Sequence, residues 1–261
     1  GGIRGVAFNA LLVFQVQSPW VCVSNLGMTD VMNTRADVRI HSNSCGDQVG
    51  QGAYTTADSG RIDSFLYGNQ TLLVVVAASN EGDDAIPDIG TAGQYNVGTD
   101  GNGEVDGGSV TSQSIAKNVI TVGSSENNRP AVNSLWNNSI YFGWISPDKG
   151  ITGKNGQLKF PNPPFVGDRT SNNPDGMSAF SSRGSGGVGA NLFNQVGPQN
   201  AFQVRIKPDI TAPGGNILST RSRLLTTLGN NLDGTNPNTV LYRFTSGTSM
   251  ATPHVAGAAA I

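Results

Sequence analysis

Short apolar runs rich in β-branched residues recur along the 261 residues of the chain, and each run soon meets Gly, Pro, Ser or Asn. Runs of this kind are typical of strands that are buried on both faces of a sheet. The gaps between the first three runs leave room for crossover helices, around residues 25–36 and 56–67. The pattern therefore predicts an α/β fold with a mainly parallel sheet flanked by helices. The runs are residues 10–16, 38–41, 72–77, 119–122 and 206–212.

Charge and composition exclude several classes of protein. The 16 basic and 18 acidic side chains give a net charge of -2, which offers no electrostatic attraction to a nucleic acid. The longest apolar run, residues 72–78, is far shorter than the roughly 18–20 residues that cross a bilayer. Charged residues are only 13% of the chain and Gly is abundant, which suits a loop-rich extracellular protein. We expect one globular domain over residues 1–261 that binds neither nucleic acid nor membrane.

Ligands of parallel α/β sheets bind beyond the carboxyl ends of the strands. The segments 43–46, 79–82 and 213–215 are therefore expected to carry the chemistry. Residues 184–189 have the Gly-x-Gly-x-x-Gly letters of a dinucleotide site, but neither a preceding strand nor a following helix is predicted. We expect a flexible loop there.

The most specific motif is the string Gly247-Thr-Ser249-Met-Ala-Thr-Pro253-His-Val-Ala-Gly257, which places a serine near the start of a helix of small residues. A lone serine there is usually a helix cap. The first five letters are also close to the nucleophile elbow of α/β-hydrolases, with Ala replacing the final Gly. The whole string is similar to the active-site serine motif of the subtilisin-like serine proteases. That resemblance implies that Ser249 is the nucleophile of a serine endopeptidase and forms an acyl-enzyme.

Other segments resemble the same family in the same order. Residues 77–82 are similar to the family segment whose Asn donates to the oxyanion, which assigns that role to Asn80. Residues 42–46 resemble the strand that pairs with the substrate backbone. The resemblance thus implies substrate binding by Ser44, Cys45, Gly46, Ala78 and Ser79. Further landmarks are residues 4–13, 180–184 and 207–214, and residues 39–44 together with 126–129 are similar to the oxidatively stable alkaline branch of the family.

Two family motifs do not occur in these residues, namely the Asp-Thr/Ser-Gly strand and the His-Gly-Thr helix of the catalytic triad. Asp58-Ser-Gly60 has the first set of letters in the wrong order along the chain, so we expect a surface turn there. His41 and His254 are expected to be packed in the core. The chain thus resembles a catalytic domain truncated at both ends, without its N-terminal strand and helix, and we predict that it is inactive alone. A missing His also leaves open a non-catalytic relative used as a binding module, although an intact Ser249 and Asn80 argue against it.

Two departures fall in the expected substrate cleft. Ser79 stands where the family has Gly and would narrow the pocket, and Cys45 replaces a larger side chain. Cys22 is the only other cysteine, so a disulfide, two free thiols or part of a shared metal site are all open.

Oxygen-bearing side chains stand at every second position of residues 100–106, with Gly or Val105 between them, which lets a loop curl around one hard cation. An acidic solvated turn explains the pattern as well, but the resemblance favours a structural calcium ion. Its expected ligands are Asp100, Asn102, Glu104 and Asp106. No cofactor is needed for the chemistry. The resemblance also implies a secreted monomer that acts on protein or peptide substrates.

Overall fold

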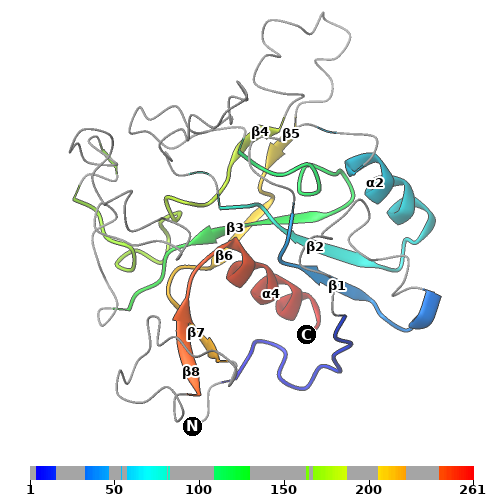
Figure 1. The fold of residues 1–261 in the computed structure, drawn as a ribbon, viewed down its shortest axis with the longest axis horizontal. Coiled ribbons are helices and arrows are strands. Elements are labelled where there is room, and N and C mark those ends of the chain that lie inside the picture. The colour runs from blue at the N-terminus through cyan, green and yellow to red at the C-terminus, as the bar shows by residue number, and fades with distance from the viewer. Residues whose placement is uncertain are drawn as a thin grey trace, which may run out of the picture.

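A parallel sheet of four strands lies at the centre of the computed structural model (Figure 1). Its strands, in spatial order, are β1 (Ile40–Asn43), β2 (Leu73–Ala77), β3 (Ile120–Ser125) and β6 (Ile210–Pro213). All three neighbouring pairs are parallel, which confirms the predicted mainly parallel α/β sheet. The structure describes residues 4–15, 33–46, 54, 58–80, 82, 109–129, 163–164, 167–186, 205–221 and 241–261.

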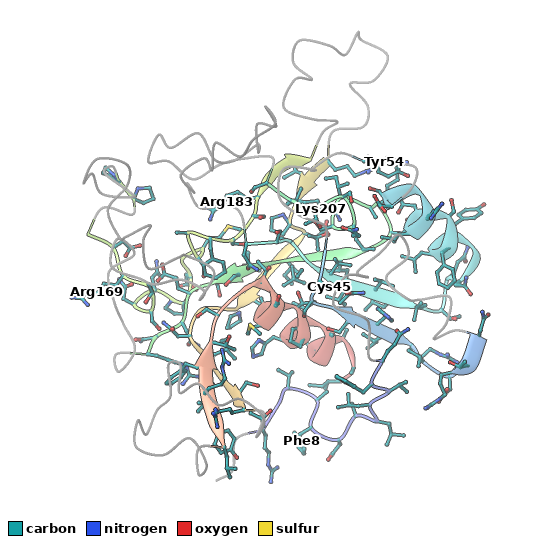
Figure 2. All side chains as sticks on the ribbon, in the orientation of Figure 1. Phe8, Cys45, Tyr54, Arg169, Arg183 and Lys207 are labelled. Carbon is teal, nitrogen blue, oxygen red and sulfur yellow. The ribbon has the colours of Figure 1, made fainter. Side chains whose placement is uncertain are left out.

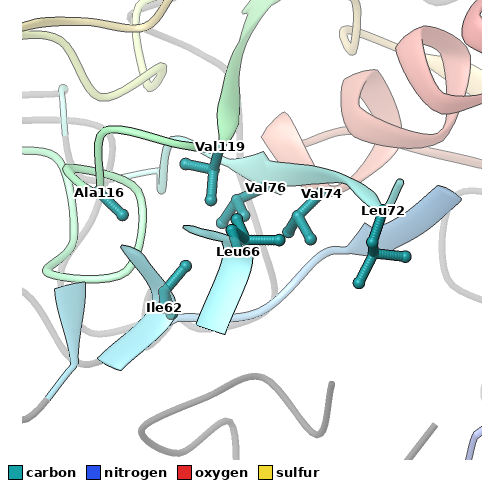
Figure 3. Close-up of a cluster of buried hydrophobic side chains, with 7 residues drawn as sticks. All are labelled: Ile62, Leu66, Leu72, Val74, Val76, Ala116 and Val119. Atoms are coloured by element: carbon teal, nitrogen blue, oxygen red, sulfur yellow. The ribbon is translucent and has the colours of Figure 1, made fainter. Parts of the chain in front are cut away.

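Two helices, α2 (Ser59–Gly68) and α4 (Thr248–Ala259), cover opposite faces of the sheet. Successive side chains of a strand point to opposite faces. Val74 and Val76 of β2 accordingly pack in one apolar cluster with α2 (Figure 3), and Val75 packs in another with α4. All three valines are fully buried. The sheet is thus the middle layer of three, as a continuous apolar run such as β2 predicts.

Two smaller antiparallel sheets complete the described part of the chain. The first pairs β4 (Gly184–Gly186) with β5 (Arg205–Lys207), and the second pairs β7 (Ile217–Thr220) with β8 (Tyr242–Thr245). Lys207 is buried at the end of β5, and its Nζ donates to the C=O of Val119 and to Asp209 (Figure 2). These bonds attach β5 to the segment that leads into β3.

Three local predictions were wrong. Residues 10–15 form no strand, and Leu11, Leu12 and Phe14 are exposed. A strand needs a neighbouring strand to pair its backbone N–H and C=O groups, and no described strand pairs with this segment. The glycine-rich residues 184–186 are not a flexible loop, since their backbone pairs with β5. Asp58-Ser-Gly60 is not a surface turn, since Asp58 is the N-cap of α2. None of the described helices is long and apolar enough to cross a membrane.

Candidate active site

The N-terminus of α4 meets the carboxyl ends of three parallel strands. The loops after β1, β2 and β6 each hydrogen-bond to it, through Ser44 to Ser249, Asn80 to Thr248 and Gly214 to Gly247. These loops are the segments that were expected to carry the chemistry. The structure therefore brings together Ser249 and Asn80, which lie 169 positions apart in the sequence.

Ser249 is the second residue of α4 and is half-buried. Its Oγ donates to the C=O of Ser44 at 3.1 Å. The first turn of a helix carries a partial positive charge, and no acidic residue of this turn offsets it. The position thus favours negative charge that develops beside the Ser249 hydroxyl.

Asn80 is held in one orientation by Thr248. Its Oδ1 accepts the backbone N–H of Thr248 at 2.8 Å and the hydroxyl of Thr248 at 3.0 Å. A backbone N–H can only donate, so the atom that faces Thr248 is the amide oxygen and Nδ2 is turned away from it. Neither Nδ2 of Asn80 nor the N–H of Ser249 has a hydrogen-bond partner among the described residues. In the described part of the chain, two donors near the start of α4 are therefore left for an anion.

The loop that carries Asn80 is strained and closely packed. Ser79 has a φ of 95°, a conformation that residues with a side chain rarely adopt. Its C=O accepts the N–H of Ser182 at 3.0 Å, and the N–H of Gly82 donates to Phe180 at 2.9 Å. A Cβ at Gly82 would overlap the carbonyl oxygen of Ser181. Backbone contacts on both sides of Asn80 thus fix this loop.

The predicted substrate residues have different environments. Ser44 is exposed, and Cys45, Gly46 and Ser79 are half-buried. Ala78 is fully buried and its side chain belongs to an apolar cluster.

Cys45, labelled in Figure 2, lies just beyond the end of β1 and is disulfide-bonded. The free-thiol alternative is therefore wrong for this residue. The other cysteine of the chain, Cys22, lies outside the described residues.

Neither histidine of the chain is hydrogen-bonded to the Ser249 hydroxyl. Nδ1 of His254 lies 2.8 Å from the C=O of Met250, so this nitrogen carries the proton and donates. His41 lies on β1, where burial lowers its pKa below the usual 6.5. Its buried Nδ1 has no hydrogen-bond partner among the residues that the structure describes.

Sequence reasoning missed two contributions to this site. Thr248 orients Asn80, and the hydroxyl of Ser44 donates to the C=O of Ser249 at 2.8 Å. A Thr directly before the motif's Ser was the signal for the first contact, because a residue at a helix start has an unpaired N–H. The predicted calcium ligands, Asp100, Asn102, Glu104 and Asp106, lie outside the described residues.

A model of the subtilase family of peptidases matches residues 1–261. The chain therefore belongs to the subtilase family, whose members are subtilisin-like serine proteases, as the serine motif and the parallel sheet predict.

Individual relatives match over different lengths. Subtilisin-like protease SBT4.10 of Arabidopsis thaliana is 47% identical over 68 residues, which are 26% of this chain and 9% of the relative. The serine protease/ABC transporter B family protein tagD of Dictyostelium discoideum is 28% identical over 263 residues, covering 87% of this chain and 12% of the relative. The solved structure of sphericase has 21% identity and a TM-score of 0.40, covering 88% of this chain and 44% of that one. The chain spans about a tenth of the length of these two curated relatives.

Proposed function

We infer that the protein is a serine endopeptidase that cleaves peptide bonds through an acyl-enzyme on Ser249. Membership of the subtilase family supports peptidase chemistry. One observation carries the finer assignment, namely the double hydrogen bond from Thr248 to Oδ1 of Asn80. This contact turns an amide donor away from Thr248, and that donor has no partner among the described residues near the start of the helix that carries Ser249, an arrangement suited to acyl transfer.

The reaction follows from these groups. Oγ of Ser249 bonds to the carbonyl carbon of the peptide, and its proton passes to a general base. The oxyanion that forms accepts hydrogen bonds from Nδ2 of Asn80 and the N–H of Ser249. The C–N bond then breaks, the amine takes the proton from the base, and the acyl group remains on Ser249. Water hydrolyses this ester, which releases the acid and restores the hydroxyl.

Neither histidine of the chain is placed to act as the general base. Both histidines of the chain lie within the described residues, and the Ser249 hydroxyl donates to a backbone carbonyl instead of either ring. A carbonyl oxygen cannot act as a base near neutral pH. The 261 residues alone should therefore show no enzymatic turnover.

Kinetics of Asn80→Ala in the full-length gene product test the assignment. The kcat should fall about 10²- to 10³-fold, the magnitude that loss of the equivalent Asn has in subtilisin. KM should change little, because the oxyanion exists only near the transition state. Asn128→Ala, which removes an exposed amide elsewhere, is the matched control and should retain full activity. An increase in KM with an unchanged kcat would contradict the oxyanion role.

A further inference from the structure

Pro253 lies inside α4 and changes the hydrogen bonding of the nucleophile's own backbone. In an α-helix the N–H of each residue donates to the C=O four residues earlier, so the C=O of Ser249 would pair with residue 253. Proline has no N–H, and its ring crowds the carbonyl four residues before it. The C=O of Ser249 therefore lacks the usual backbone donor of residue 253.

Ser44 supplies the missing donor from another element. Its Oγ donates to the C=O of Ser249 at 2.8 Å, across 205 positions of sequence. The Oγ of Ser249 donates back to the C=O of Ser44 at 3.1 Å. The two serines are thus joined by a reciprocal pair of hydrogen bonds between the loop after β1 and the start of α4.

The backbone carbonyls on either side of Ser249 also accept side-chain hydrogen bonds, but from donors of a different origin. The C=O of Thr248 accepts the hydroxyl of Thr252, and the C=O of Met250 accepts Nδ1 of His254, both at 2.8 Å. Those two donors belong to α4 itself. Of these three carbonyls, the C=O of Ser249 is the one whose side-chain donor comes from outside α4, namely from Ser44 in the loop after β1.

We propose that Ser44 is a positioning residue, whose hydroxyl replaces the N–H that Pro253 lacks and fixes the Ser249 backbone against the loop after β1. The C=O and N–H of Ser249 lie on either side of one Cα, so holding the carbonyl also sets the direction of the N–H toward the oxyanion. Because Ser249 must be the nucleophile for this role to exist, Ser44 acts only if the proposed function holds.

The first measurement compares Ser44→Ala with Ser44→Thr in the full-length gene product. The kcat is expressed per active site, counted by titration with a fluorophosphonate, so misfolded molecules do not enter it. Loss of one partly exposed hydrogen bond should lower the kcat of Ser44→Ala about three- to tenfold, with KM nearly unchanged. Ser44→Thr keeps the donor at an exposed position and should stay within about twofold of the unsubstituted enzyme. Ser64→Ala, which removes an exposed hydroxyl on α2, is the control and should change nothing.

The second measurement repeats Ser44→Ala in a Pro253→Ala background. Pro253 is exposed, and its replacement supplies a backbone N–H for the C=O of Ser249. Removing the Ser44 hydroxyl should then cost less than about twofold in kcat, because the carbonyl has a second donor.

Three results would overturn the role of Ser44. They are an unchanged kcat in Ser44→Ala, an increase in KM alone, or the same loss of kcat with and without Pro253. A different result, turnover or labelling that persists in Ser249→Ala, would overturn the proposed function and the role of Ser44 together.

Discussion

Ser79→Gly should stabilise the protein, although it removes a side chain from the edge of the active site. A residue with a Cβ at φ 95° is strained by about 1–3 kcal/mol. Glycine removes that strain, but it also increases the conformational entropy of the unfolded chain, which lowers the gain in stability by about 0.4–1 kcal/mol. The Ser79 hydroxyl bonds to none of the described residues, so its loss costs little. The net gain of about 1 kcal/mol corresponds to an increase in Tm of roughly 2–4 °C for a domain of this size.

Thermal unfolding of the full-length gene product measures this gain. All variants carry Ser249→Ala, so that self-cleavage does not distort the transition. Ser79→Ala keeps the Cβ and should show no increase in Tm. Ser64→Gly makes the same chemical change inside α2 and should lower stability by about 0.5–1 kcal/mol. If Ser79→Gly lowers Tm as Ser64→Gly does, the strain at Ser79 is not real and the reasoning fails.

Three further outcomes follow from single contacts. Thr248→Val removes one of the two donors to Asn80 and should lower kcat about two- to tenfold, whereas a change confined to KM would refute the orienting role. Gly82→Ala should destabilise by about 1–3 kcal/mol because its Cβ overlaps Ser181, and Gly68→Ala, where the space is open, should not; equal Tm values would refute the overlap. His41 has a lowered pKa in the fold, so the unfolded state binds its proton first, and stability should fall as pH drops below about 6.5. Denaturant titrations from pH 8 to 5 should show a smaller loss of unfolding free energy in His41→Gln than in the unsubstituted protein. An equal loss in both proteins would contradict this role of His41.

The sequence predicts those strands of the sheet whose side chains are buried on both faces. The valines of β2 are apolar on both faces, and the structure buries all of them between α2 and α4. The apolar run that begins at residue 10 looks similar, yet residues 10–14 are exposed. Apolar periodicity records a preference for burial, but it does not say which neighbouring strand provides the pairing.

The candidate site could be predicted only as far as local motifs reach. The serine string singled out Ser249, and the segment after β2 singled out Asn80. The contacts that orient them, from Thr248 and from the Ser44 hydroxyl, connect residues 168 and 205 positions apart. Such contacts depend on the tertiary fold, which brings strand ends and a helix start together. The disulfide at Cys45 was equally undecided, because two cysteines permit several states.

Covalent labelling of Ser249 tests the central claim most directly. A fluorophosphonate probe should modify the full-length gene product at Ser249, because this hydroxyl lies at the start of α4, next to the residue that orients Asn80. Ser249→Ala should abolish the label, and Asn80→Ala should slow its formation, since the phosphonyl oxygen occupies the place of the oxyanion. Mass spectrometry of the labelled peptide identifies the site. A label that persists in Ser249→Ala, or that lies on another residue, would contradict the assignment.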